Sequence, residues 1–367
     1  MWLNRFIDDI SNWDAEPPFM CISLDLRPGP GGRPSAPNAL RAAWANEGQE
    51  DLEKYRTFGD TIELTGELVD EAMRDDTEGI FLVASAQAPT EPRIMSLPIA
   101  CRNDMRVVDR PWLFELERTA YFAARPVVTV FTDREDTDMM RVIFGERESG
   151  DQIEHATHAL QKLHGRTDAE SMVGTPTSFG GGHAWNKIEN IVDEHRNAAA
   201  RESAEAVVDL VQENDILVIS GPVKSRSNLV NHLPEGLSVV LREDEGGFGT
   251  ERERRAYSAD LACRVQTEAA DQLASSVLAG DYGELVARGR EPMDMMFTEG
   301  RVARFVVHED AVTHWGDHMD ARLIEGQHDN WLGEALWKAR ETSAEVLFGQ
   351  HPPVLHDHQG AIATLRW

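Results

Sequence analysis

The sequence is poor in cysteine and lacks the local patterns of several common sites. Its cysteines are Cys21, Cys101 and Cys263, an odd number, far apart and without a Cys-x-x-Cys spacing. Such a set indicates neither a disulfide framework nor a zinc site. The glycine run at 246–249 does not end in Gly-Lys-Ser/Thr, and no serine nucleophile elbow is present. These absences exclude a phosphate loop and a hydrolase of that type.

Positive charge is also scarce. Lysine and arginine number 36 against 64 acidic residues, five of the 36 are lysines, and the formal net charge is −28. The affinity of nonspecific nucleic-acid binding comes mainly from neutralising phosphates. The composition therefore argues against unassisted binding of this kind. It leaves open binding through local basic patches or as part of a larger assembly.

Long apolar runs are missing, including at the N-terminus, where Asp8 and Asp9 follow the first residues. No signal peptide or membrane span is predicted, and we expect a cytoplasmic protein.

Histidines gather in two places near the C-terminus, with acidic neighbours in the first of them: His308, Glu309, Asp310, His314, Asp317 and His318, then His351, His356 and His358. His314 and His318 have the spacing of two ligands on one helical face. Gly316 lies between them and no HExxH frame surrounds them, so we expect polar loops, no metal and no cofactor.

Apolar runs separated by amphipathic stretches predict an α/β protein of three consecutive domains. The chain is too long for one ordinary core. In the first domain, 1–124, strands are expected at 19–24 and 79–84, and a helix through Trp44 and Leu52 after a turn-rich segment at 28–37.

The second domain, 125–245, is predicted to open with a hairpin of runs 126–131 and 140–145 around an acidic turn. A glycine loop at 174–182 precedes a long helix that begins near Trp185, with apolar residues at three- and four-residue steps. Strands at 216–221 and 237–241 follow, with a short helix between them that Ser225 caps.

The third domain, 246–367, is predicted to contain helices at 256–279, 292–300 and 331–348 and strands at 301–307 and 361–366.

The order of elements in the second domain resembles the middle domain of archaeo-eukaryotic peptide-chain release factors, where Gly-Gly-Gln precedes the long helix. The corresponding residues here are Gly181-Gly182-His183-Ala184-Trp185-Asn186-Lys187, and the next strand ends in Ser220-Gly221-Pro222. Residues 295–302 and 360–367 are similar to that family's C-terminal domain. The segment 220–227 is similar to the family's bacterial branch, which includes Balon-type ribosome hibernation factors. The resemblance covers about residues 125–367.

The resemblance places one loop at the peptidyl-transferase centre of the ribosome, formed by Gly180, Gly181, Gly182, His183, Ala184 and Trp185. Glycines allow close approach of the backbone to the tRNA end. His183 lacks the paired amide donor and carbonyl acceptor of glutamine, so we expect no peptide release and no catalytic residue. Two alternatives stay open: His183 as a general base, and an ordinary glycine-rich surface loop.

Further residues are predicted to contact rRNA or tRNA: Asn186, Lys187, Lys224 and Arg226. Lys187 is one of few lysines in an acidic chain, whereas Lys224 and Arg226 follow a strand end and could equally form a solvated face. Trp185 could stack on a base or anchor the helix in the core.

No Asn-Ile-Lys-Ser tetrapeptide, the stop-codon reader of release factors, occurs in the first domain. The resemblance therefore implies a monomeric, non-enzymatic hibernation or protection factor in the ribosomal A site. Implied partners are rRNA, P-site tRNA and elongation factor Tu. The alternatives are a peptidyl-tRNA hydrolase for stalled ribosomes and a stress-associated RNA-binding module acting off the ribosome.

Overall fold

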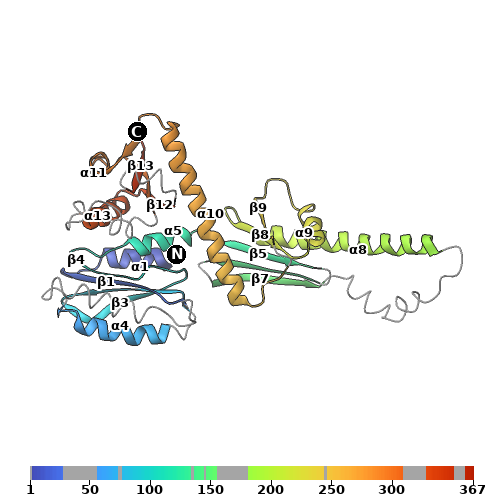
Figure 1. The fold of residues 1–367 in the computed structure, drawn as a ribbon, viewed down its shortest axis with the longest axis horizontal. Helices are drawn as coiled ribbons and strands as arrows, with labels where there is room; N and C mark the ends of the chain where they lie inside the picture. The colour runs from blue at the N-terminus through green and yellow to red at the C-terminus, as the bar shows by residue number, and fades with distance from the viewer. Residues whose placement is uncertain are drawn as a thin grey trace. The chain divides into compact units, whose positions relative to one another are not determined.

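The computed structural model describes residues 2–27, 56–72, 77–133, 136–143, 146–154, 181–243, 246–308, 328–350 and 360–367. The protein is α/β, as predicted, with three sheets that fall in the three segments expected to be domains (Figure 1). It divides into two compact units. The first unit combines Met1–Ala124 with Cys263–Trp367, and the second is Arg125–Ala262.

The first sheet is antiparallel and has the order β3-β2-β1-β4. Its strands are β1 (Phe19–Asp25), β2 (Gly79–Ser85), β3 (Ala88–Leu97) and β4 (Asp104–Val108). The predictions at 19–24 and 79–84 are confirmed. The segment at 28–37 and the helix through Trp44 and Leu52 lie outside the described residues.

Helices cover both faces of this sheet: α4 (Gly59–Ala72) lies on one, and α1 (Trp2–Ser11) and α5 (Phe114–Phe122) on the other (Figure 1). Side chains of a strand alternate between the faces, so Met20, Ile22 and Leu24 pack in one cluster with Phe58 and Val69.

The sheet of the C-terminal segment has the order β10-β13-β11-β12. Its strands are β10 (Val286–Arg288), β11 (Val302–His308), β12 (Glu345–Gly349) and β13 (Ala361–Leu365), and its helices are α10 (Glu251–Ala279), α11 (Arg290–Thr298) and α13 (His328–Glu341). The strands at 301–307 and 361–366 and the helices at 256–279 and 292–300 are confirmed, with shifted ends.

The helix predicted at 331–348 is wrong in its last part. Helix α13 ends at Glu341, and β12 pairs in parallel with β11. The helix stops because Ser343 adopts a positive φ of 54°, a left-handed conformation typical of helix ends. The apolar residues that follow then pair with β11, a long-range contact that helical spacing cannot reveal.

Phe348 of β12 joins the two sheets of the first unit. Its ring lies 5.4 Å from that of Phe114, 5.9 Å from Tyr121 and 6.3 Å from Phe122, all on α5 or its end. The first and third segments of the chain therefore share one core.

The second unit contains a sheet of order β7-β6-β5-β8-β9. Its strands are β5 (Val127–Thr132), β6 (Asp136–Ile143), β7 (Glu146–Glu154), β8 (Ile216–Ser220) and β9 (Val239–Leu241), and its helices are α8 (Gly181–Leu210) and α9 (Val223–Val230). The predicted hairpin and the strands at 216–221 and 237–241 are confirmed. The acidic turn of the hairpin is tied by the N–H of Asp136, which donates to Asp133 Oδ1 at 3.0 Å.

Strand β7 was not predicted, because its sequence is almost entirely polar. It pairs antiparallel with β6 at the sheet's edge. A polar strand is compatible with the edge of a sheet, because a strand at this position has a neighbouring strand on one side only. The pairing with β6 decides the conformation.

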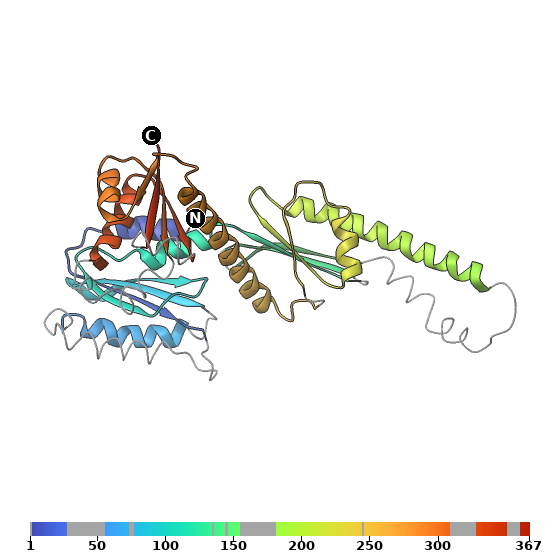
Figure 2. The ribbon, with the colours of Figure 1, turned by 45° about the horizontal axis from the view of Figure 1, so that its top comes forward.

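The core of the second unit lies between this sheet and helices α8 and α9. Val130 and Ile219 from the strands meet Val207 of α8 and Leu229 of α9, all buried. Figures 1 and 2 show the N-terminal part of α8 running past the sheet. The core therefore holds the C-terminal part of a helix whose other end projects.

Candidate functional site

Helix α8 begins earlier than predicted. The backbone is helical from Gly181, so Gly181–Trp185 is not the loop expected before a helix start near Trp185. Gly180 lies outside the described residues. The predicted roles of Gly182, His183, Ala184, Asn186 and Lys187 stay predictions.

A cavity of about 540 Å³ lies in the second unit, where β5 and β8 end and α8 passes α9. The described residues that line it are Thr132, Asp133, Arg196, Asn197, Ala200, Pro222, Lys224, Ser225, Ser227, Asn228 and Asn231. Strands β5 and β8 are parallel. The cavity therefore lies at the carboxyl edge of a parallel pair, the usual place for a ligand in an α/β sheet.

Gly221, which follows β8, lies very close to the backbone of Thr132 at the end of β5. It has φ of +118°, and a Cβ built on it would lie 2.0 Å from the carbonyl oxygen of Thr132. Any side chain at this position would force the ends of β5 and β8 apart. The turn from β8 into α9 is consequently built on glycine.

Helix α9 starts at the cavity. Its N-cap is Pro222, and no side-chain capping bond is made. Ser225 is thus not the cap that was predicted, but a residue of the first turn that lines the cavity. The first N–H groups of a helix have no intrahelical acceptor and carry partial positive charge.

Lys224 is exposed and lines the cavity, as does Arg196 of α8. The Nδ2 of Asn228 donates to the carbonyl oxygen of Arg196 at 3.3 Å, which ties α9 to α8. Two basic side chains from different helices therefore line one cavity, and sequence reasoning missed Arg196.

Arg226 does not take the place predicted for it. The side chain is 8% exposed, and its guanidinium donates to the carbonyl oxygen of Arg242. Two positions along a helix correspond to about 200° of rotation, so Lys224 and Arg226 face opposite sides of α9. Arg226 packs inside the unit and not at the surface where an RNA backbone would lie.

Arg242 belongs to a cluster of arginines and aromatic rings. Its guanidinium lies 4.5 Å from the ring centroid of Phe248 and 4.8 Å from that of Tyr257. Arg254 lies 5.2 Å from the Phe248 ring and forms an ion pair with Asp138. These stacked contacts fasten the start of α10 to the sheet of the second unit.

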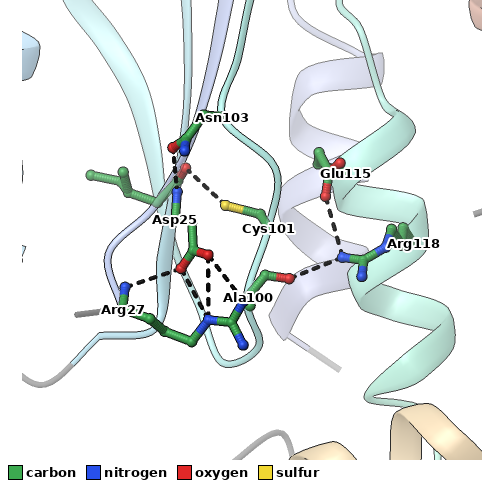
Figure 3. A network of polar contacts seen from close by, with 8 residues as sticks. Asp25, Arg27, Ala100, Cys101, Asn103, Glu115 and Arg118 are labelled. Atoms are coloured by element: carbon green, nitrogen blue, oxygen red, sulfur yellow. Dashed lines mark hydrogen bonds and ion pairs between the residues drawn. The ribbon is translucent and has the colours of Figure 1, made fainter. Parts of the chain in front are cut away.

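The buried cysteines are not nucleophiles. Burial raises the pKa of Cys21 to about 12, and burial also raises the pKa of Cys101. Cys21 Sγ accepts the N–H of Trp112 at 3.2 Å, and the Cys101 thiol points to the carbonyl oxygen of Ile80 (Figure 3). Both thiols stay protonated at neutral pH, and a thiolate is the reactive form.

No group of three His, Cys, Asp or Glu side chains able to hold a metal occurs among the described residues. His308 is buried at the end of β11. Its predicted neighbours, and His351, His356 and His358, lie outside the described residues. In the described part of the chain, every helix is too short or too polar to cross a membrane.

No family profile matches the sequence, and no curated protein matches it.

Several solved structures of translation termination-like proteins are similar to the chain. An archaeal translation termination factor is 16% identical, with a TM-score of 0.27 over 100% of this chain and 97% of its own. Pelota of Archaeoglobus fulgidus is 12% identical, with a TM-score of 0.36 over 78% and 79%. S. cerevisiae Dom34 is 8% identical, with a TM-score of 0.34 over 80% and 81%. At these values the similarities carry no conclusion about family membership or activity.

Proposed function

We propose that the chain is a ribosome-associated translation factor that occupies the A site without releasing the nascent peptide, in a hibernation or protection role. One observation carries the proposal. A β-hairpin, Gly181-Gly182-His183, a long helix and a strand ending in Ser220-Gly221-Pro222 follow one another in the order seen in release factors.

The length of α8 suits this role. The helix has 30 residues, or about 45 Å at 1.5 Å per residue. Its C-terminal part is packed in the core of the second unit, while the Gly-Gly-His end projects past the sheet (Figure 2). A projecting helix end could enter a channel too narrow for a whole domain.

The chemistry at that end argues against peptide release. Glutamine offers an amide donor and a carbonyl acceptor together, whereas a neutral imidazole offers one donor and one acceptor on opposite sides of a ring. A water molecule that the glutamine side chain positions is therefore not positioned in the same way by the histidine ring. Release would require His183 to act as a general base.

The acidity of the chain requires that RNA contacts be few. With a net charge of −28, affinity cannot come from broad phosphate neutralisation. Lys224 is exposed and stays a proposed contact, whereas Arg226 is buried. Asn186 and Lys187 remain proposed contacts near the projecting end, and elongation factor Tu and P-site tRNA remain proposed partners.

Sedimentation tests the proposal. We expect the protein to migrate with 70S ribosomes in gradients of stationary-phase lysate, and purified protein to bind vacant ribosomes. Ribosomes carrying labelled peptidyl-tRNA should release no more peptide with the protein than in buffer. Protein that stays at the top of the gradient under every growth condition would refute ribosome association. Release that is lost in His183→Ala would identify a peptidyl-tRNA hydrolase instead.

A further inference from the structure

The cavity between α8 and α9 combines features that favour an anion. Two cationic side chains, Arg196 and Lys224, line it from different helices. The first turn of α9 adds backbone N–H groups and the hydroxyl of Ser225, and Ser227 adds a second hydroxyl. Phosphate groups in α/β proteins are commonly held at such a strand–turn–helix junction.

The opposing charge at the cavity comes from Asp133, among the described residues that line it. Asp133 Oδ1 accepts the backbone N–H of Asp136, so this oxygen is engaged in its own turn. Among the described residues that line the cavity, two charged side chains are therefore cationic and one is anionic.

The remaining lining is suited to a larger ligand than an inorganic ion. Asparagine amides at 197, 228 and 231 carry both donors and acceptors. The volume of about 540 Å³ lies within the usual range of small-molecule sites, about 300–1,000 Å³. Inorganic phosphate alone would leave most of this space to water.

We propose that this cavity binds a small phosphate monoester of about the size of a mononucleotide. Arg196 and Lys224 hold the phosphate together with the first turn of α9, and the asparagine amides bind the polar part attached to it. Guanidinium groups suit this chemistry because they donate two parallel hydrogen bonds to phosphate oxygens. The proposal does not depend on ribosome binding, so either can fail alone.

The test is titration calorimetry on the full-length protein with adenosine monophosphate, inorganic phosphate and adenosine. We expect the monophosphate to bind more tightly than phosphate, and adenosine without phosphate not to bind. Arg196→Ala and Lys224→Ala should each weaken binding at least tenfold, while Lys224→Arg keeps most of it. Arg201→Ala is the matched control, since Arg201 is exposed on α8 and does not line the cavity.

Three results would overturn the proposal: no binding of the monophosphate at millimolar concentration, equal weakening by Arg201→Ala, or binding of adenosine as tight as that of the monophosphate. A short single-stranded RNA whose binding is weakened by Arg196→Ala and Lys224→Ala, with no binding of the monophosphate, would replace the small ligand by an RNA backbone. Thermal unfolding of each variant separates a lost site from a lost fold.

Discussion

Lys224 and Arg226 show how strongly position on one helix turn determines the environment of a basic residue. Both follow the same strand end, and both are charged. Lys224 is exposed, whereas Arg226 is buried and bonded to the Arg242 carbonyl oxygen. The first can contact a ligand and the second holds α9 against the segment after β9.

A pair of substitutions tests this difference. Arg226→Ala removes a buried hydrogen bond and leaves a cavity, so it should lower the free energy of unfolding by about 1–3 kcal/mol. Lys224→Ala changes an exposed side chain and should stay within about 0.5 kcal/mol. Urea unfolding of the two variants measures both values. Equal losses would contradict the burial of Arg226.

A second feature at the scale of single residues is the carboxyl group of Glu115, which is buried (Figure 3). Burial raises its pKa from the ordinary 4.5, while Arg118 and Arg102 oppose the rise. Arg118 lies 3.4 Å from its carboxylate and donates to the carbonyl oxygen of Ala100 at 2.9 Å. Glu115 therefore helps α5 hold the segment before β4.

The raised pKa of Glu115 predicts a pH dependence with a definite sign. The folded protein binds this proton more tightly than the unfolded chain, so the contribution of Glu115 to stability falls as pH rises from 4.5 to the raised pKa. Wild-type stability relative to Glu115→Gln should decline across that window and then level off. Urea unfolding of both proteins at closely spaced pH values measures the difference, and a constant difference would contradict the shift.

At the scale of elements, α13 joins the two sheets of the first unit. Trp337 Nε1 donates to the carbonyl oxygen of Pro111 at 2.9 Å, and Arg110 stacks on the Trp337 ring at 4.1 Å. Arg340 pairs with Glu117 at 3.0 Å and with Asp8. These contacts tie α13 to α1, to α5 and to the segment before α5.

Removing Arg340 should weaken this joint. Burial raises the pKa of Glu117, and Arg340 opposes the rise, so Arg340→Ala leaves a largely buried carboxyl group without its cation. We expect a loss of about 1–3 kcal/mol. Arg304→Ala is the control, because Arg304 and its partner Glu345 are both exposed and should contribute less than about 1 kcal/mol. Urea unfolding checks both, and a control loss as large as that of Arg340→Ala would contradict the assignment.

At the scale of the whole molecule, the identity of residue 183 distinguishes a protein that only occupies the ribosomal A site from one that also hydrolyses peptidyl-tRNA. If the projecting end of α8 reaches the peptidyl-transferase centre, His183→Gln restores the donor and acceptor pair that positions water. We expect release of labelled peptide from ribosome complexes at least about tenfold above wild type, since positioning accounts for much of such a rate. His183→Ala, the control, should stay at background. Equal release by the two variants would mean that this end does not reach the ester.

Local patterns were sufficient wherever a segment's own residues specify its conformation. The apolar runs of β1, β2, β5 and β8 form strands, and the amphipathic stretch of α8 forms a helix. The α/β class follows from these elements, because alternation and helical spacing are properties of neighbouring residues. The proposed role of Gly181-Gly182-His183 also rests on sequence order alone.

Packing between segments decided the rest. Strands β7 and β12 exist because β6 and β11 pair with them, and Arg226 is buried because α9 turns it toward Arg242. Gly221 lets β8 end close to β5, and Arg196 and Lys224 then meet at one cavity. None of these contacts has a signature in a short window of sequence: the residues of β7 are almost entirely polar, and the other contacts join residues that lie further apart in the chain.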